Sequence, residues 1–313
     1  MSTSSKYPRR RAIKHIAISA VTLGSLSAAA SAAPRKKTET HYTMKGNINH
    51  SVCRWCYGSI PLDEFCAAVK GIGMTAIDLV GPKEWPTLQK YGLYSSMCNG
   101  AEINLTDGWN HTEFHPQLIK NYSEMIPLVA QAGYKQLICF SGSRRNLDDE
   151  TGWKNCVDGL KKVIGIAEKH NVTLVMELLN SKIDHKDYQC DKTAWGVALV
   201  KRLGSENFKL LYDIYHMQID EGDVIRTIRD NHQYISHYHT GGVPGRREIN
   251  ESQELYYPAI MKAITDLGFK GYVAQEFIPT PKDAKGQIAS LESGVRIGDV
   301  QYDLEHIHLV DIT

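Results

Sequence analysis

The sequence has almost no net charge, since 36 Lys and Arg residues face 35 Asp and Glu residues among 313, for a formal charge of +1. A protein that binds nucleic acid or an anionic membrane surface usually carries a strong basic excess. Neither partner is therefore expected. The content of 42% hydrophobic and 23% charged residues is typical of a globular protein, for which we expect a small-molecule partner.

Three further patterns are missing from the sequence. After residue 33, no stretch is long and apolar enough to span a bilayer. The seven cysteines are an odd number spread over a long chain, which excludes a regular disulfide framework, and Cys53 and Cys56 lack the second pair that a zinc site needs. No Gly-x-Gly-x-x-Gly motif follows an early predicted strand, which disfavours an open doubly wound sheet.

The first 33 residues have the layout of an export signal. Arginines at 9–11 precede a moderately apolar segment at 16–26 and an Ala-Ser-Ala cleavage site at 30–32. The arginines resemble the twin-arginine pattern, with Ala12 and Ile13 in place of the usual large apolar pair. We expect twin-arginine export to the periplasm, with the ordinary secretory route and an uncleaved membrane anchor as the alternatives.

The rest of the chain alternates short apolar runs with longer segments of helical periodicity. Such alternation predicts parallel strands joined by crossover helices. Eight apolar runs predict a closed (β/α)8 TIM barrel in one domain at 46–300, with a linker at 34–45 and a C-terminal tail at 301–313. The predicted strands are 46–51, 76–80, 94–99, 136–140, 173–178, 208–214, 235–240 and 271–277.

Glycine and proline predict where some of the helices end. Gly133 and Gly268 are expected to terminate the helices that precede them, because glycine readily adopts the left-handed conformation of a helix end. Pro82 and Pro86 leave room for only a short helix in the second unit of the barrel.

Four predicted strands carry, at or near their ends, a residue that can bind a metal or transfer a proton. Glu177, Asp213 and Glu276 each follow an apolar run, and His239 lies near the end of another. Because the carboxyl ends of parallel barrel strands meet at one end of the barrel, these side chains are expected to converge. His237 faces the same side by strand alternation, and we prefer His239 because it lies nearer the strand end.

Three carboxylates and one imidazole form a hard, mostly oxygen ligand set. This set favours Mg²⁺, Mn²⁺ or Co²⁺ over a thiolate zinc site. Such an ion can stabilise the enediolate that forms when a proton leaves the carbon between a carbonyl and a hydroxyl group. Glu177 and Glu276 are the candidate catalysts that take and return this proton. The alternative for Glu177 is a rim acid paired with a lysine such as Lys182.

Candidate substrate-binding residues surround this predicted centre. His216 follows Asp213 closely enough for its loop to return over the same opening, and the guanidinium of Arg246 suits a pair of substrate oxygens. The alternative for Arg246 is a solvated loop arginine. Weaker candidates at the same opening are Asn180, Lys182, His185 and Trp55, the last of which is equally expected to be a core residue.

Three segments resemble the hydroxypyruvate isomerase family of the xylose-isomerase-like barrels. They are 178–188 (Leu-Leu-Asn-Ser-Lys-Ile-Asp-His-Lys-Asp-Tyr), 211–217 (Leu-Tyr-Asp-Ile-Tyr-His-Met) and 237–246 (His-Tyr-His-Thr-Gly-Gly-Val-Pro-Gly-Arg). The resemblance implies interconversion of hydroxypyruvate and 2-hydroxy-3-oxopropanoate, with Glu177 and Glu276 as proton donor and acceptor. It also implies that Asp213 and His239 complete the metal site. Family members can have glutamine at the position of His239, whereas the related ketose 3-epimerases have histidine there.

Several other functions are compatible with these patterns. The nearest alternative is a ketose 3-epimerase, or another sugar isomerase or dehydratase of the same superfamily. A DNA-repair endonuclease with a trinuclear zinc site shares this barrel, but the neutral charge and the export signal argue against it. A non-catalytic sugar-binding module is a third alternative. The expected partner is a small hydroxy-oxo acid or sugar, without nucleic acid or a membrane span after signal removal, and a homo-oligomer is compatible with the sequence.

Overall fold

The fold is a barrel of parallel strands surrounded by helices. The computed structural model describes residues 42–300, so the predicted export signal, most of the predicted linker and the tail at 301–313 lie outside the described residues. Within this range the chain forms one sheet of eight strands. The strands are β1 (Asn49–Val52), β2 (Ala76–Val80), β3 (Tyr94–Cys98), β4 (Gln136–Cys139), β5 (Thr173–Glu177), β6 (Phe208–Asp213), β7 (Ile235–Thr240) and β8 (Tyr272–Gln275).

The order of the strands closes the sheet into a ring. The sheet runs β1-β8-β7-β6-β5-β4-β3-β2, and every pair of neighbours is parallel. A parallel bridge between Cys53 and Asp78 then joins the edge that follows β1 to the edge formed by β2. The TIM barrel predicted from the eight apolar runs is therefore confirmed.

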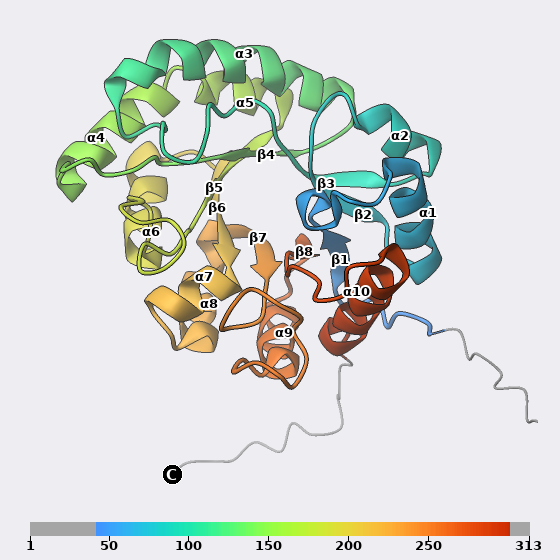
Figure 1. The fold of residues 1–313 in the computed structure, drawn as a ribbon. Helices are drawn as coiled ribbons and strands as arrows, with labels where there is room; N and C mark the ends of the chain where they lie inside the picture. Colours follow the sequence, from blue (N-terminus) through green and yellow to red (C-terminus); the bar gives the residue numbers. More distant parts are fainter. Residues whose placement is uncertain (1–41, 301–313) are drawn as a thin grey trace, which may run out of the picture. The chain divides into compact units, whose positions relative to one another are not determined.

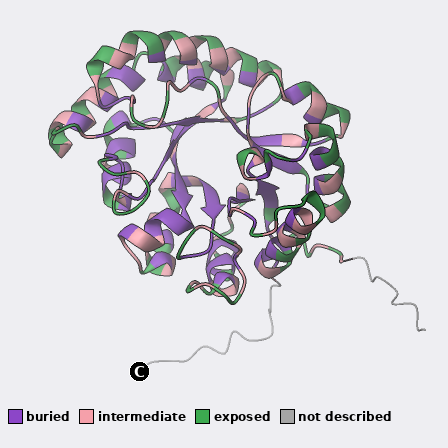
Figure 2. Ribbon diagram, in the orientation of Figure 1, coloured by how far each residue is buried: buried purple, intermediate pink, exposed green. Residues whose placement is uncertain are grey.

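The helices lie outside this ring (Figure 1). Their inward faces and the strands are buried, and exposed residues gather on their outer faces (Figure 2), as expected for amphipathic helices that cover a sheet. In the described part of the chain the helices are α1 (Leu62–Ile72), α2 (Trp85–Lys90), α3 (His115–Gln131), α4 (Asp149–Leu160), α5 (Ile164–His170), α6 (Thr193–Leu203), α7 (Ile214–Asp220), α8 (Val224–Asn231), α9 (Tyr257–Asp266) and α10 (Ala284–Gly298), with short 3-10 turns η1 (Arg54–Tyr57), η2 (Thr112–Phe114) and η3 (His232–Tyr234).

The predicted helix ends agree with the structure. Gly133 and Gly268 follow the ends of α3 and α9 with φ values of 85° and 72°, in the left-handed region that glycine adopts without strain. Helix α2 is only six residues long. The first strand begins at Asn49 rather than at the predicted residue 46, because the ladder to β8 starts with the pair Asn49 and Tyr272.

Residues at the two ends of the described chain are hydrogen-bonded to each other. The hydroxyl of Tyr42 and the backbone amide of Lys45 both donate to Asp299, at 2.5 Å and 2.7 Å. The Asn47 side chain donates to the carbonyl of Val300 at 3.0 Å. The last residues of the predicted linker are therefore attached to the barrel through the end of α10.

All seven cysteines lie between residues 53 and 190, within the described chain, and all are free. Between residues 42 and 300, no helix combines the length and the apolar character needed to cross a membrane.

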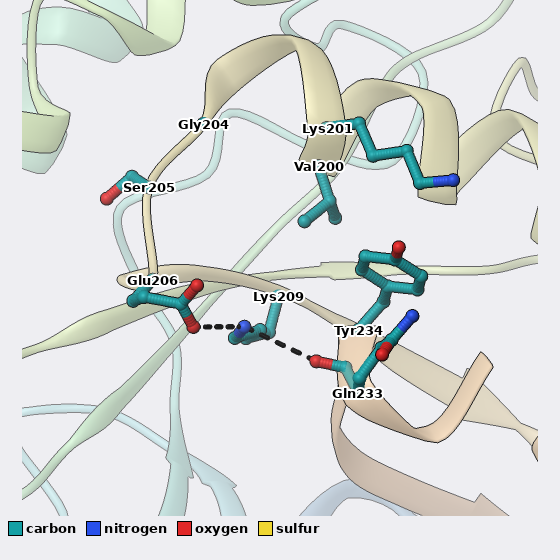
Figure 3. A pocket seen from close by; sticks show the side chains of 8 residues that line it. All are labelled: Val200, Lys201, Gly204, Ser205, Glu206, Lys209, Gln233 and Tyr234. Carbon is teal, nitrogen blue, oxygen red and sulfur yellow. Dashed lines mark hydrogen bonds and ion pairs between the residues drawn. The ribbon is translucent and has the colours of Figure 1, made fainter.

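A hollow of about 370 Å³ lies at the amino ends of β6 and β7 (Figure 3). Lys209 donates there to Glu206 at 2.7 Å and to the carbonyl of Gln233 at 3.3 Å, and Lys201 lies over the ring of Tyr234 at 5.2 Å. Chemistry in TIM barrels is located at the opposite, carboxyl end of the strands. We therefore interpret these contacts as stabilising the loops at the amino end.

The buried His50 on β1 should make the protein less stable in acid. Burial lowers its pKa from 6.5 to about 4, with Asp299 opposing the shift. The unfolded chain therefore takes up this proton first, so the free energy of unfolding should fall between pH 6.5 and 4, by up to about 3 kcal/mol, and not above pH 6.5. Urea unfolding across this range should show a shallower decline for His50→Leu and a wild-type decline for His232→Leu, since His232 is exposed. An unchanged pH dependence in His50→Leu would contradict this prediction.

Candidate metal centre

The structure brings the four strand-end residues together at the carboxyl end of the barrel. Glu177 ends β5, Asp213 ends β6, His239 lies on β7, and Glu276 directly follows β8. One ligand atom from each of the four residues lies within 4.8 Å of those from the other three, and all four residues are buried. The ladder explains this arrangement, because it pairs Asp213 with His239 and His239 with Ala274, two residues before Glu276.

One ring nitrogen of His239 faces Glu276 and Glu177, and the other faces Asp78. Its Nδ1 lies 2.8 Å from Glu276 Oε2 and 3.3 Å from Glu177 Oε1. Its Nε2 lies 3.1 Å from Asp78 Oδ1. His237 also faces the barrel interior, as alternation predicts, but its Nε2 contacts Asp78 Oδ2 at 2.8 Å. Of the two histidines that the sequence offers, His239 is therefore the one that joins the four-residue cluster.

Three carboxylates buried so close together are unfavourable in their ionised form, because they repel one another and are removed from water. Burial raises the pKa of Glu177 and, more strongly, that of Asp213. Burial also opposes ionisation of Glu276, but the Arg246 guanidinium and His239 outweigh it and hold the pKa of Glu276 well below its usual value. Further positive charge would stabilise all three carboxylates.

The donor set fits a divalent cation. Glu177 Oε1 is buried and has no hydrogen-bond partner among the described residues, although it faces Nδ1 of His239. The other nitrogen of that ring, Nε2, contacts Asp78, which leaves Nδ1 directed at Glu177 and Glu276. Carboxylate oxygens with one imidazole suit a hard or borderline divalent ion, so the cluster is a candidate metal centre.

Arg246 lies against this cluster rather than in solvent. Its Nη2 contacts Asp213 Oδ2 at 3.2 Å and Glu276 Oε2 at 2.5 Å, and only 14% of its side chain is exposed. The guanidinium lies between the rings of Trp55 and Tyr215, at 5.3 Å and 5.2 Å. The alternative of a solvated loop arginine is therefore wrong.

His216 contacts Arg246, and Asn180 in turn contacts His216. Nη1 of Arg246 lies 3.1 Å from His216 Nε2, and the amide of Asn180 lies 2.6 Å from His216 Nδ1 and 2.7 Å from Asp184 Oδ2. Burial, followed by the nearby Arg246 charge, lowers the pKa of His216 well below its usual value, which keeps this ring neutral. Both residues are fully buried, so we interpret them as positioning residues for Arg246.

Lys182 is directed elsewhere. Its ammonium group donates to the carbonyls of Ile219 and Asp220 at 2.8 Å and 3.0 Å, at the end of α7. Lys182 does not line the cavity at the cluster, and the alternative pairing with Glu177 is not present. The reason is local, because a positive charge is stabilised by the carbonyls at a helix C-terminus.

A cavity of about 320 Å³ opens onto the cluster. Of the predicted residues, Trp55, Glu177, His185, Arg246 and Glu276 line it, whereas Asn180, Lys182 and His216 do not. Trp55 is 47% exposed and donates from its indole to Glu276 Oε1 at 2.8 Å, so it is a rim residue and not a core residue. The rest of the wall is apolar and consists of Leu79, Leu105, Phe140 and Leu179.

Sequence reasoning missed Asp78. This fully buried carboxylate accepts a hydrogen bond from Ser96 at 2.6 Å and contacts both His237 and His239. The signal was its place inside the apolar run at 76–80, since a buried acid requires partners. The two histidine partners lie more than 150 residues further along the chain, at positions that spacing alone does not identify.

Asp78→Asn should weaken metal binding by roughly 10- to 100-fold, the usual effect of losing the group that orients a histidine ligand. The amide preserves the shape of the side chain but removes the negative charge that fixes His239. Titration of the purified protein with Mn²⁺ in a calorimeter would measure the change. Asp63→Asn is the matched control, because Asp63 is an exposed aspartate on α1 that pairs with Lys90. Equal affinities in the two variants would exclude this role for Asp78.

Comparison with known proteins agrees with this geometry. The family described as "Xylose isomerase-like TIM barrel" matches residues 86–294. A D-psicose 3-epimerase from Ruminiclostridium cellulolyticum is 30% identical over 231 residues, which cover 70% of this chain and 69% of that protein. A human protein named as a presumed hydroxypyruvate isomerase is 28% identical over 130 residues. These residues cover 42% of this chain and 47% of the human protein. The chain thus spans about half the length of that relative.

A solved structure extends the likeness in fold. The crystal structure of a family 2 AP endonuclease from Brucella melitensis superposes with a TM-score of 0.68 at 22% identity, and covers 79% of this chain and 97% of that chain. This identity shows the fold alone. The family match spans most of the barrel, including all four residues of the candidate metal centre. The chain belongs to the xylose isomerase-like TIM barrel family.

Proposed function

We propose that this chain is a metal-dependent isomerase or epimerase that moves a proton at a carbon next to a carbonyl group. One observation carries the proposal: Glu177 and Glu276 line the same cavity and both belong to the candidate metal centre. Two carboxylates beside one substrate can remove a proton and return it to a neighbouring carbon or to the opposite face. A divalent ion would supply the positive charge that stabilises the enediolate form of the substrate.

The residues of the chain have distinct tasks in this reaction. Glu177 and Glu276 carry the proton, and Asp213 and His239 complete the set of metal ligands. Arg246 presents a guanidinium to the cavity, and its position between two aromatic rings fixes the direction in which that group can bind substrate oxygens. The apolar side of the cavity restricts access of water to the reacting carbon.

The first candidate reaction is the interconversion of hydroxypyruvate and 2-hydroxy-3-oxopropanoate. The three sequence segments that resemble the hydroxypyruvate isomerase family support it, as does the match to the human relative. Arg246 is the group that would bind the substrate carboxylate.

The second candidate is epimerisation of a ketose at C3. The match to the D-psicose 3-epimerase supports it, because that relative aligns over more than two thirds of both chains. The charge of the cavity also favours it: Arg246 already contacts two carboxylates, and a neutral ketose needs no additional cation.

A substrate panel followed by NMR in deuterated water tests the proposal. Protein loaded with Mg²⁺ is offered hydroxypyruvate, D-fructose and D-psicose, since Mn²⁺ would broaden the spectra. We expect deuterium to enter at the carbon next to the carbonyl in at least one of them. Conversion of hydroxypyruvate supports the first candidate, and conversion of D-fructose or D-psicose supports the second. No exchange in any substrate would leave a non-catalytic sugar-binding module as the better account.

A further inference from the structure

A second cavity adjoins the cavity at the metal centre. The second cavity has a volume of about 280 Å³, and Leu79, Leu105 and Phe140 line both. It lies at the ends of β3 and β4, and neither Glu177 nor Glu276 lines it. The rest of its wall consists of Asn99, Glu102, Ile103, Asn104 and Ile138. The two cavities therefore adjoin each other at these three side chains, Leu79, Leu105 and Phe140, at the carboxyl end of the barrel.

One residue of the wall that the two cavities share, Leu79, has a strained backbone conformation. Leu79 has a φ of 54°, a left-handed conformation that leucine rarely adopts because it strains the backbone. The ladder between β2 and β3 is irregular around this residue, with register shifts between Ile77 and Asp78 and, across Leu79 itself, between Asp78 and Val80. A bulge of this kind redirects a side chain, and such strain is concentrated at functional sites. Here the redirected side chain is one of the three that line both cavities.

The charges around the two cavities indicate the kind of ligand. The acids in their walls are Glu102, Glu177 and Glu276, and the one Arg or Lys residue that lines either cavity is Arg246. Arg246 is already paired with Asp213 and Glu276. A phosphate group would meet acids in both cavities without a free cation, so the opening suits an uncharged ligand.

The size and polarity of the second cavity indicate a further sugar unit. Small-molecule sites usually occupy about 300–1,000 Å³, and the first cavity alone already reaches this range. A three-carbon acid would leave the second cavity unused. Its apolar wall suits the C–H face of a sugar ring, and Asn99 and Glu102 bring polar groups that can pair with hydroxyls.

We propose that the second cavity is a binding subsite for an uncharged sugar unit attached to the ketose that reacts at the metal centre. This inference rests on the proposed function, and it specifies the substrate as a glycosylated ketose. Leu79, Leu105 and Phe140 separate the reacting unit from the attached one. Ile103 and Ile138 line the subsite and do not line the cavity at the metal centre.

The test compares two ketoses that differ by one sugar unit. D-fructose is the short probe, and isomaltulose, in which a glucose unit is attached to the 6-hydroxyl of fructose, is the long one. We expect kcat/KM of the wild type to be at least tenfold higher for isomaltulose. Ile103→Trp fills the subsite and should lower the ratio of the two kcat/KM values at least tenfold. Leu128→Trp, on the outer face of α3 where Leu128 is 44% exposed, is the matched control and should keep the wild-type ratio.

The outcomes separate the subsite from the proposed function. Equal kcat/KM values for the two sugars, or an equal loss for both in Ile103→Trp, would overturn the subsite and leave the proposed function standing. If neither sugar reacts, saturation-transfer NMR still tests the subsite, because isomaltulose should show transfer to its glucose protons in the wild type and much less in Ile103→Trp. Absence of transfer to the glucose protons in the wild type would overturn the proposal.

Discussion

Replacing Glu177 or Glu276 by glutamine should lower kcat by roughly 10²–10⁴-fold, the usual contribution of a positioned general acid or base. Glutamine keeps the size of the side chain and one ligand oxygen, so metal affinity should fall less steeply than turnover. Both carboxylates line the cavity, and both face Nδ1 of His239, so neither can substitute for the other without a change in geometry. Turnover and deuterium incorporation, measured at saturating Mg²⁺, would quantify both variants.

The double variant is the informative control for this prediction. If the two glutamates act on one proton, Glu177→Gln with Glu276→Gln should be little worse than either single variant, because members of one catalytic unit are not additive. Glu248→Gln is a matched surface control, since Glu248 accepts hydrogen bonds from Thr280 outside the cavity. Wild-type exchange in either single variant would remove that glutamate from the mechanism and favour a merely structural ion.

The sequence predicts those parts of the site that can be identified from the residue pattern of a single strand. An acid directly after an apolar run ends a buried strand, and parallel topology then places all such ends together. Glu177, Asp213 and Glu276 share this signal, and so does the place of His239 on its strand. The fold follows from the same periodicity, and for this reason seven of the eight predicted strands begin within one residue of the observed ones.

The parts that the sequence does not predict depend on contacts between distant strands. Asp78 lies on β2 and the histidine it orients lies on β7, two strands that are not neighbours in the sheet, and nothing in their sequence spacing couples them. Lys182 has the right loop for a substrate contact, but the C-terminal carbonyls of α7 bind its ammonium group. The second cavity depends on a bulge at Leu79, which no local pattern of residue types predicts.

Removing divalent metal with a chelator should lower turnover by roughly 10³-fold or more, because a metal ion supplies several kcal/mol of transition-state stabilisation and each 1.36 kcal/mol corresponds to a factor of ten. The protein should also become less stable. Three buried carboxylates would then share one guanidinium, whereas an ion present at 1,000 times its Kd stabilises the folded state by about 4 kcal/mol. For a domain of this size the Tm should rise by roughly 8 °C or more when metal is added.

Thermal unfolding and turnover, each followed while Mn²⁺ is returned to the chelated protein, would check this prediction. We expect both to recover over the same range of metal concentration, because one ion serves both. Asp213→Asn should move that range to higher concentration, since it removes a charged ligand, whereas Asp63→Asn on the surface of α1 should not. Full turnover after chelation, with an unchanged Tm, would show that the four residues hold no ion. Arg246 would then be the cation that keeps the three carboxylates together, and proton transfer would have to proceed with that guanidinium alone stabilising the enediolate.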